Sequence, residues 1–386
     1  MKRIFKQVPR ILFGEGSLSQ IKDLIPEKLQ NDILIIVDDS LPELPILKIV
    51  DEDRIIRFPA QLGEPKTIQV DKINVNLQNN NQKLPTAIIG IGGGSTMDVA
   101  KAVSLMLTNV GESADYQGWD LVNMPGIFKV GVPTISGSGA ESSRTAVLMG
   151  KEKKFGINSD YSMFDSILLD SMLTHSIQDE QRFFTGMDCF IHCVESLQGT
   201  MTNDLSKAYA SKALELFRKS YQEGYDADEM MVASYLGGAS IVNSEVGICH
   251  ALSYGLSLEL GFRHGIANCI AFNVLDDYYG IHVKEFHSMV DKFNIYLPKN
   301  VCCDLSENKL NRMVEMTMKM EEIESSSSLT EDEIKHHIKT ANKYQVEIKN
   351  VGIKDPKLKD KLKARIEKEI EKITPYYDEI KNVVIT

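Results

Sequence analysis

Short apolar runs alternate with polar segments through the first half of the chain. Residues 33–37 (ILIIV), 87–91 (AIIGI), 130–133 (VGVP) and 166–170 (SILLD) are dominated by Val, Ile and Leu. Short apolar runs rich in β-branched residues are typical of strands that are buried on both faces of a parallel sheet. Residues 97–108 follow the second run with helical spacing. This order of strand, helix and strand predicts an open α/β sheet.

The pattern changes near residue 180, where the β-branched runs end. Residues 205–221, 229–242 and 247–260 place apolar side chains at positions i, i+3 and i+4. This period is that of a helix with one buried face. We therefore predict an α/β domain over residues 1–180 and a helical domain over residues 181–386.

The last segment, from about residue 321, is more charged than the rest. Residues 324–328 (ESSSS) predict a loop, and Ser328 or Thr330 is suited to cap the helix that follows. Residues 357–373 place Leu and Ile on one stripe among Lys and Glu. That pattern predicts an amphipathic helix that packs on its own domain or on a second subunit.

Length and composition narrow the class of protein. A chain of 386 residues exceeds what one core usually supports, in agreement with two domains. The net charge of -11 argues against a nucleic-acid binder, which would need a basic face. The six cysteines include no C-x-x-C pair, which favours reduced thiols and a cytoplasmic protein. No apolar run approaches the ~18 residues of a membrane span, so no membrane association is expected.

Asp188 and His192 are the first candidate site residues. They lie four residues apart within residues 186–196 (GMDCFIHCVES), and on a helix this spacing puts both side chains on one face. A carboxylate and an imidazole so placed can hold two positions around a divalent metal ion. The alternative is an ordinary acidic residue and a core histidine, because such pairs are common on helices.

His250 and His264 extend this pair, since they lie on or beside the later predicted helices. Either histidine alone is more often structural. With Asp188 and His192 they supply one carboxylate and three imidazoles from neighbouring helices. That set fits Fe2+ or Zn2+ and leaves one coordination position open for a substrate oxygen.

A glycine-rich turn joins the second predicted strand to its helix. Gly92, Gly93, Gly94 and Ser95 leave backbone N–H groups free to bind an anion, and the helix dipole adds partial positive charge. We interpret this turn as a pyrophosphate site. The alternative is a tight turn that needs glycine only for its conformation, and the turn is not the G-x-G-x-x-G fingerprint.

Two further features fit a dinucleotide cofactor. Asp39 closes the first predicted strand, where its carboxylate can accept both hydroxyls of an adenosine ribose and repel a 2′-phosphate. NAD(H) is therefore expected rather than NADP(H); the alternative is an Asp that caps a loop. Residues 134–141 (TISGSGAE) form a second Gly/Ser-rich loop that is suited to line the cofactor cleft, with Thr134 and Ser138 near the nicotinamide.

Together these motifs resemble the iron-containing (group III) alcohol dehydrogenase family over roughly residues 8–290. The glycine turn, with Asp98 and Lys101, is similar to the family's phosphate-binding motif G-G-G-S-x-x-D-x-A-K. The family's four metal-ligand positions fall, at the family's spacing, on Asp188, His192, His250 and His264. The resemblance implies a Rossmann-like dinucleotide-binding domain and an all-helical metal-binding domain, the fold of dehydroquinate synthase-like proteins.

A finer resemblance indicates one branch of the family. Residues 134–147, 186–200 and 250–257 are similar to the 3-deoxy-D-manno-octulosonate (Kdo) 8-oxidases. This resemblance implies oxidation of the terminal primary alcohol of Kdo to an aldehyde. A partner aminotransferase would then convert the aldehyde to an 8-amino sugar of lipopolysaccharide. The family commonly forms dimers, so a homodimer is expected.

Metal-assisted hydride transfer to a nicotinamide is the mechanism that the resemblance implies. Tyr254 departs from the family, because many members have a histidine there that is thought to move protons. A phenol, with a pKa of about 10, is a poorer base, and Tyr254 is the remaining candidate for the relay. Arg144, Lys154 and Arg263 lie near the predicted cleft in sequence. We assign Lys154 to the cofactor and the two arginines to the carboxylate of an acidic substrate.

Three other functions stay open on sequence grounds. The same site run in reverse would reduce a small aldehyde. A related lyase or synthase would use NAD only transiently, as dehydroquinate synthase does. The third is a non-catalytic binding protein on the same fold, although a chain without catalysis has no need of four metal ligands.

Overall fold

The computed structural model describes residues 4–79, 83–151, 153–302, 305–319 and 330–340. Its N-terminal half contains a six-stranded sheet in the order β1-β9-β6-β4-β2-β3, and all neighbouring strands are parallel. The strands are β1 (Arg10–Phe13), β2 (Ile33–Asp38), β3 (Ile55–Phe58), β4 (Ala87–Gly92), β6 (Phe128–Pro133) and β9 (Ser166–Leu169). The four predicted strands are confirmed as β2, β4, β6 and β9, whereas the edge strands β1 and β3 are not evident in the sequence pattern.

Alternating side chains explain why the central strands are apolar throughout. In β2, the fully buried Ile35 packs in the same core as the 3-10 helix η1 (Ser17–Leu24). The next residue, Ile36, points to the opposite face and packs with α1 (Thr67–Asn79) and α2 (Gly94–Met106). The sheet is therefore covered on both sides, as a parallel sheet requires.

The glycine turn places α2 directly behind β4. This helix begins at Gly94, earlier than the start predicted at residue 97, because Gly94, Ser95 and Thr96 are helical although they carry no apolar signal. A second sheet, not predicted from the sequence, packs its β7 (Thr145–Met149) against α2. Its other strands are β5 (Gly118–Trp119) and β8 (Lys154–Asn158).

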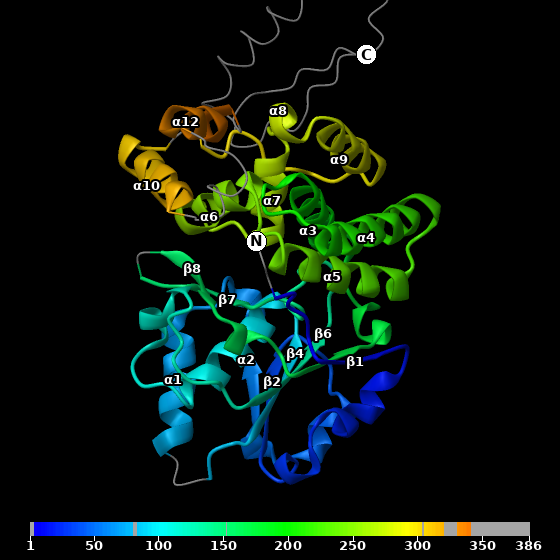
Figure 1. Cartoon of the computed structure of the whole chain (residues 1–386), viewed down its shortest axis with the longest axis vertical. Coiled ribbons are helices and arrows are strands. Elements are labelled where there is room, and N and C mark those ends of the chain that lie inside the picture. Colours follow the sequence, from blue (N-terminus) through cyan, green and yellow to red (C-terminus); the bar gives the residue numbers. More distant parts are fainter. Residues whose placement is uncertain (1–3, 80–82, 152, 303–304, 320–329, 341–386) are drawn as a thin grey trace, which may run out of the picture.

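The C-terminal half is helical and begins with α3 (Asp179–Gln198), which packs against α4, α5, α6 and α7 (Figure 1). The other helices are α4 (Asp204–Glu223), α5 (Ala227–Val242), α6 (Ile248–Leu260), α7 (His264–Phe272), α8 (Asp276–Tyr279), α9 (Ile281–Lys292), α10 (Glu307–Met318) and α12 (Glu331–Thr340). Among the described residues, no helix combines the length and the apolarity needed to span a membrane. The fold is thus an α/β domain followed by a helical domain, as predicted.

Close backbone contacts join the two halves beside the site. Gly137 has φ 139° and lies against α3, where an added Cβ would come within 1.8 Å of the carbonyl oxygen of Thr185. Elsewhere the side chain of Asn243, after α5, accepts from the N–H of Lys6 at 2.8 Å and donates to its carbonyl oxygen at 2.8 Å. The Gly137 contact holds the loop after β6 against the helix that carries Asp188 and His192, and the Asn243 contacts hold the N-terminal segment against the end of α5.

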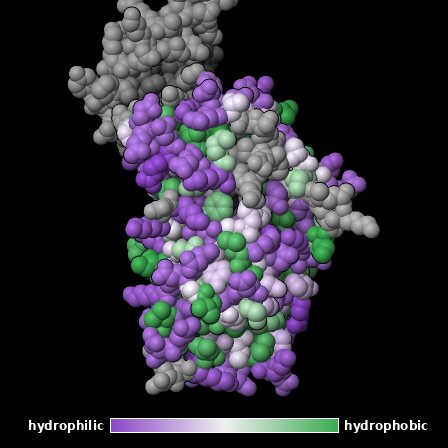
Figure 2. Space-filling model, turned by 60° about the vertical axis from the view of Figure 1, so that its left-hand side comes forward, coloured by the Kyte–Doolittle hydropathy of each residue, from purple (hydrophilic) through white to green (hydrophobic). Residues whose placement is uncertain are grey.

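The charged tail is described in part. Thr330 precedes α12, and its Oγ1 accepts from the N–H of Glu333 while the Glu333 carboxylate accepts from the N–H of Thr330. This reciprocal cap agrees with the predicted helix start. The loop predicted at residues 324–328 and the helix predicted at residues 357–373 lie outside the described residues. On the face in Figure 2, hydrophobic residues are scattered among hydrophilic ones.

Candidate metal centre and cofactor cleft

Three helices bring the four predicted ligands together. Helix α3 carries Asp188 and His192, α6 carries His250, and α7 begins at His264. Oδ1 of Asp188 lies 3.6 Å from Nε2 of His192, 3.4 Å from Nε2 of His250 and 3.7 Å from Nε2 of His264. One ligand atom from each residue falls within 4.8 Å of all the others. The spacing that put Asp188 and His192 on one helical face thus places them in a single cluster with the two later histidines.

The protonation of the cluster suits a cation. Burial lowers the pKa of His192 and of His264 to about 4, so both imidazoles are neutral near pH 7. Burial also opposes the charge of Asp188, but the surrounding histidines outweigh it and hold the pKa of this carboxyl below its usual range. One carboxylate with neutral imidazoles is the donor set of Fe2+ and Zn2+ sites. The residues present therefore fit a divalent metal ion.

Glu195 orients the third ligand. Its Oε2 lies 2.6 Å from Nδ1 of His250, and its Oε1 accepts from the N–H of Cys249 at 2.7 Å and from the hydroxyl of Tyr279 at 3.0 Å. Burial alone would lower the pKa of His250, but the charge of Glu195 outweighs burial and raises it to about 10. Without a metal ion His250 therefore keeps a proton on each ring nitrogen near pH 7, and a cation bound at Nε2 would displace one of them. With Nδ1–H donated to Glu195, Nε2 is left to face Asp188. The sequence offers a signal for Glu195, since it lies on the same face of α3 as Asp188 and His192.

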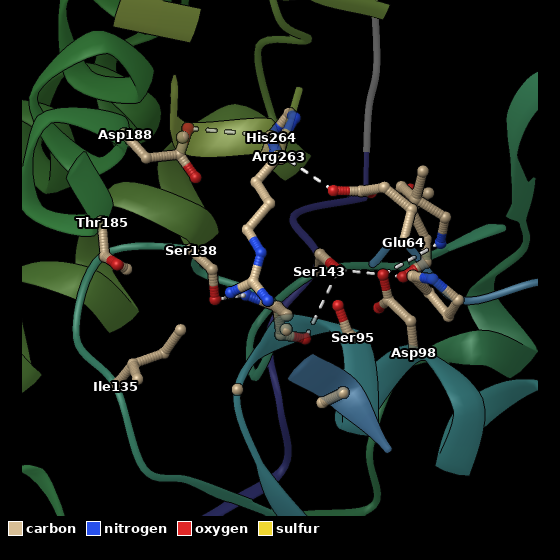
Figure 3. A pocket seen from close by; sticks show the side chains of 18 of the residues that line it. Glu64, Ser95, Asp98, Ile135, Ser138, Ser143, Thr185, Asp188, Arg263 and His264 are labelled. Atoms are coloured by element: carbon tan, nitrogen blue, oxygen red, sulfur yellow. Dashed lines mark hydrogen bonds and ion pairs between the residues drawn. The ribbon is translucent and has the colours of Figure 1, made fainter. Parts of the chain in front are cut away.

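His264 is the most exposed of the four ligands. The side chains of Asp188, His192 and His250 are each 3% exposed, whereas that of His264 is 30% exposed. All four residues line a cavity of about 1060 Å3 that also reaches Asp38 at the end of β2. Figure 3 shows Asp188 and His264 at the edge of this cavity, on the side of the helical domain. A substrate therefore reaches the cluster from the cavity.

The glycine turn forms part of the cavity wall. Gly93, Gly94 and Ser95 line it, while Gly92 lies outside the lining. A Cβ on Gly93 would lie 2.9 Å from Cδ1 of Ile135, so a side chain there would have to displace the end of Ile135. The turn sits at the N-terminus of α2, where backbone N–H groups and the helix dipole favour an anion. These features fit a pyrophosphate, and the predicted residues Thr134 and Ser138 line the same cavity.

The acidic residue at the end of β2 that lines the cavity is Asp38, one position before the predicted Asp39. Asp38, 7% exposed, lines the cavity, whereas Asp39 is exposed and is not among the lining residues. The reason is the two-residue period of a strand, which turns successive side chains to opposite sides. Oδ1 of Asp38 accepts from the N–H and the hydroxyl of Ser40 at 3.0 and 2.7 Å. The structure thus puts Asp38, and not Asp39, where a ribose could be bound.

Asp98 and Lys101 connect α2 to the second sheet. Oδ2 of Asp98 accepts from the N–H of Val147 at 3.0 Å, and burial raises the pKa of Asp98 to about 6. The fully buried Lys101 donates to the hydroxyl of Ser143 and to the carbonyl oxygen of Thr145, both at 2.8 Å. Asp98 lines the cavity and Lys101 does not. Lys101 therefore supports the cavity wall, while Asp98 forms part of it.

Glu64 links the cavity to the metal ligands, and it was not predicted. Its Oε2 lies 2.9 Å from Nζ of Lys154, which is 1% exposed, and its Oε1 accepts from the N–H of His264 at 3.1 Å. Nζ of Lys154 also lies 5.3 Å from the ring centre of Tyr254, and the Tyr254 and His264 ring centres are 6.1 Å apart. Lys154 and Tyr254 thus both line the cavity next to the cluster. The role of Glu64 depends on tertiary contacts, so the sequence carries no local signal for it.

The two arginines differ in their partners. Arg144 is 6% exposed, and its guanidinium is held by the carboxylates of Asp120 and Asp160. Nη2 of Arg263 donates to the carbonyl oxygen of Gln61 at 2.7 Å, and no carboxylate partner of Arg263 is found among the described residues. Figure 3 shows the Arg263 side chain extending into the cavity. The guanidinium of Arg144 is already paired with two carboxylates. The guanidinium of Arg263 is bound to a neutral oxygen, so of the two predicted substrate residues it is the better placed to bind an anion.

A metal-ligand cluster beside a glycine-lined cavity, between an α/β sheet and a helical domain, defines a metal-dependent oxidoreductase that uses a dinucleotide. Residues 9–171 match the family Iron-containing alcohol dehydrogenase, and residues 183–373 match the Fe-containing alcohol dehydrogenase family, C-terminal. The chain belongs to the iron-containing alcohol dehydrogenase family. It is an oxidoreductase that acts on CH–OH groups with the help of a metal ion.

Individual relatives agree with this assignment. The sulfoacetaldehyde reductase of Bilophila wadsworthia is 30% identical over 285 residues, which cover 69% of this chain and 73% of that protein. Alcohol dehydrogenase 4 of Schizosaccharomyces pombe is 27% identical, over 74% of this chain and 69% of that protein.

Solved structures establish the fold. An iron-containing alcohol dehydrogenase from Thermotoga maritima has a TM-score of 0.74 at 23% identity and covers 88% of this chain and 99% of its own. A sulfoacetaldehyde reductase from Bifidobacterium kashiwanohense, in complex with NAD+, has a TM-score of 0.71 at 21% identity and covers 87% of this chain and 97% of its own.

Proposed function

We propose that this protein interconverts a primary alcohol and its aldehyde with NAD(H), and that its substrate carries an acidic group. The observation that supports the reaction is the position of the Asp188, His192, His250 and His264 cluster in the wall of the same cavity as the glycine turn. NAD(H) is favoured by Asp38, whose carboxylate would accept ribose hydroxyls and repel a 2′-phosphate. Two similar proteins agree with this choice: the sulfoacetaldehyde reductase from Bifidobacterium kashiwanohense was solved in complex with NAD+, and the methanol dehydrogenase of Bacillus methanolicus is NAD-dependent.

Different residues would bind the cofactor and activate the substrate. A divalent cation on the four ligands supplies Lewis acidity, which lowers the pKa of an alcohol and polarises an aldehyde. NAD supplies the hydride acceptor. Backbone N–H groups at Gly93 to Ser95 would hold the pyrophosphate, and Ser138 lies beside Gly94, where an added Cβ would be 3.4 Å from its side chain. Lys154 adds positive charge to the same cavity.

Tyr254 is our proposal for the group that passes the proton between substrate and solvent. Its phenol can both donate and accept a hydrogen bond. It lines the cavity, and its ring centre lies 6.1 Å from that of His264 and 5.3 Å from Nζ of Lys154. Replacing it by Phe should lower kcat while leaving the KM for NAD unchanged.

The acidic character of the substrate is inferred from one cationic side chain of the cavity wall, since carboxylates line the cavity as well. Among the described residues, three cationic side chains line it: Arg144, Lys154 and Arg263. Arg144 is paired with two aspartates and Lys154 with Glu64. Arg263 instead donates to two neutral oxygens of Gln61, the backbone carbonyl at 2.7 Å and Oε1 at 3.3 Å. A guanidinium in a low-dielectric cavity binds a carboxylate or a sulfonate through charge-assisted hydrogen bonds.

Two acidic substrates fit this description. The first is Kdo, oxidised at its C8 primary alcohol to an aldehyde that an aminotransferase would consume; resemblance of residues 134–147, 186–200 and 250–257 supports it. The second is a small acidic aldehyde, reduced to its alcohol, because a relative at 30% identity is a sulfoacetaldehyde reductase. The expected assembly is a homodimer.

Initial rates with matched substrates test both parts of the proposal. The protein, loaded with Fe2+ or Zn2+, is assayed with NAD(H) on Kdo, on sulfoacetaldehyde and on neutral primary alcohols and aldehydes of similar size. We expect turnover that requires the metal ion, with a lower KM for an acidic substrate than for its neutral counterpart. Absence of NAD(H)-linked turnover on every alcohol and aldehyde would contradict the reaction, and would favour a non-catalytic or transiently oxidising protein.

The variant Arg263→Gln tests whether Arg263 binds the acidic group of the substrate or the pyrophosphate of NAD. If Arg263 binds the substrate, this variant raises the KM for the acidic substrate roughly 10- to 100-fold and leaves the KM for NAD and for neutral substrates unchanged. If the KM for NAD rises instead, Arg263 contacts the pyrophosphate and the substrate assignment is wrong. Arg144→Gln is the matched comparison, and it should lower stability because it removes the cation that pairs with Asp120 and one of the two cations that pair with Asp160.

A further inference from the structure

A fully buried amide lies against the metal ligands. Asn268 is on α7, one turn after His264, and is 0% exposed. Its Nδ2 lies 2.6 Å from Oδ1 of Asp188. The same nitrogen is 3.2 Å from Nε2 of His250 and 3.3 Å from Nε2 of His264. Asn268 therefore contacts three of the four ligands, all through the atoms that face the centre of the cluster.

The shortest of these contacts is to Oδ1 of Asp188, the carboxylate oxygen that faces the three histidines. Oδ1 of Asp188 lies 3.4 to 3.7 Å from Nε2 of all three histidines, so it is the oxygen that a cation would share with them. A carboxylate with two equivalent oxygens can rotate, and a hydrogen bond from a fixed donor restricts that rotation. An amide N–H is suited to this task, because it is neutral and cannot itself take the place of a metal ligand.

Packing alone does not account for an asparagine at this place. Its Oδ1 is buried and has no hydrogen-bond partner among the described residues. Burying an unpaired carbonyl costs free energy, and a leucine, which has the same number of side-chain heavy atoms, would avoid that cost. The amide is therefore explained by what its nitrogen does for the cluster.

We propose that Asn268 is a positioning residue of the metal centre. Its N–H group holds Oδ1 of Asp188 in the orientation that faces the three histidines. Its side chain also covers the side of the cluster formed by Asp188, His250 and His264, so that the exchangeable coordination position faces the cavity. The inference rests on the metal centre and is independent of which alcohol or aldehyde is the substrate.

Metal affinity, measured by competition with a chelator, tests the proposal without any assay of turnover. The full-length protein and its Asn268→Leu variant are titrated with Zn2+ and with Co2+. We expect the dissociation constant of the variant to rise about 10- to 100-fold, the usual effect of removing a hydrogen bond to a metal ligand. Asn109→Leu is the matched control, because Asn109 is a buried amide whose Nδ2 donates to the carbonyl oxygens of Leu105 and Met124, in the N-terminal domain.

Thermal unfolding separates positioning from a general loss of stability. Each protein is melted with saturating Zn2+ and with excess chelator, and the rise in Tm caused by the metal is compared. Asn268→Leu should show a smaller rise than the wild type at the same free metal concentration. Asn109→Leu should lower both Tm values and leave the rise unchanged.

The outcomes decide the proposal in each case. A metal dissociation constant of Asn268→Leu within twofold of the wild type would overturn it, as would an unchanged rise in Tm. If Asn268→Leu does not fold, Asn268→Ala removes the amide without filling the space, and the same two measurements apply to it. Failure of the alcohol dehydrogenase reaction itself would leave metal affinity intact, so the two failures are distinguishable.

Discussion

Nδ1 of His250 lies 2.6 Å from the carboxylate of Glu195, and this contact determines which nitrogen of the ring faces Asp188. The carboxylate is fully buried and is itself held by the N–H of Cys249 and the hydroxyl of Tyr279. A carboxylate behind a ligating imidazole fixes the tautomer and makes the ligand more basic. Glu195 is therefore as much a part of the metal centre as the ligands themselves.

Glu195→Gln should weaken metal binding without disturbing the fold. A neutral amide can still accept from Nδ1–H, but it no longer raises the basicity of His250, so the metal dissociation constant should rise about 10-fold or more. Chelator competition measures it. Glu285→Gln is the control, because it removes a carboxylate that pairs with Arg218 away from the cluster. Equal metal affinities of Glu195→Gln and the wild type would be inconsistent with this role.

Asp38→Asn should change the choice of cofactor, and Asp39→Asn should not. Asp38 lines the cavity at the end of β2, where its charge would repel a 2′-phosphate, whereas Asp39 is exposed and outside the lining. The ratio of kcat/KM for NAD to that for NADP should fall roughly 10-fold or more in Asp38→Asn, the scale of one or two charge-assisted hydrogen bonds. The opposite pattern between the two variants would restore Asp39 as the ribose residue.

Glu64→Gln should destabilise the protein more than the removal of the whole pair. The variant leaves Lys154, 1% exposed, without its carboxylate, which costs about 3–5 kcal/mol for a buried ion pair. The double variant Glu64→Gln/Lys154→Met should recover most of that loss. Urea unfolding of the three proteins gives the comparison. Additive losses in the double variant would show that the pair is not coupled.

The same pair makes a prediction about pH. Burial opposes ionisation of Glu64, but the charge of Lys154 and the hydrogen bond from the N–H of His264 outweigh it and lower its pKa below 4.5. A carboxyl with a lowered pKa in the folded state adds stability that is complete above pH 4.5 and is lost as the pH falls below it. The stability difference between the wild type and Glu64→Gln should therefore stay constant from pH 7 to about 4.5 and shrink as the pH is lowered further, measured by urea unfolding at each pH. A difference that grows in acid would contradict the sign.

Gly137→Ala should be far more harmful than Gly224→Ala. The two glycines have similar dihedral angles, φ 139° and φ 130°, so the backbone cost of a side chain, about 1–3 kcal/mol, applies to both. A Cβ at Gly224 meets open space, whereas one at Gly137 would lie 1.8 Å from the carbonyl oxygen of Thr185. Gly137→Ala must therefore displace the loop from α3. Thermal unfolding should show the larger loss for Gly137→Ala, and equal losses would mean that the loop yields without cost.

The sequence predicted the features that have a local cause. The period of the apolar residues identified the buried strands and the long helices, because each buries a repeating face. The spacing of Asp188 and His192 placed both ligands on one face of α3, and Glu195 could have been found by the same reasoning. Roles for Tyr254, Arg263 and Lys154 stay predictions, although the structure places all three in the cavity wall.

Other features depend on contacts between distant segments. Glu64 reaches His264 across the cavity, and Asn268 contacts Asp188 on another helix, so neither role is visible along the chain. The difference between Asp38 and Asp39 depends on where β2 ends, which the apolar run does not define to within one residue. The pairing of β5 with β8 could not be predicted from the sequence, because β5 contains only two residues and shows no strand period.

Transfer of a deuterium label tests the central claim most directly. The metal-loaded protein is incubated with NAD and a primary alcohol deuterated at the carbinol carbon, and the NADH formed is analysed by mass spectrometry. If hydride passes from the alcohol to the nicotinamide at the Asp188 and histidine cluster, the NADH carries the deuterium, and His264→Ala protein forms none. NADH without deuterium, or aldehyde formed without NADH, would contradict the account.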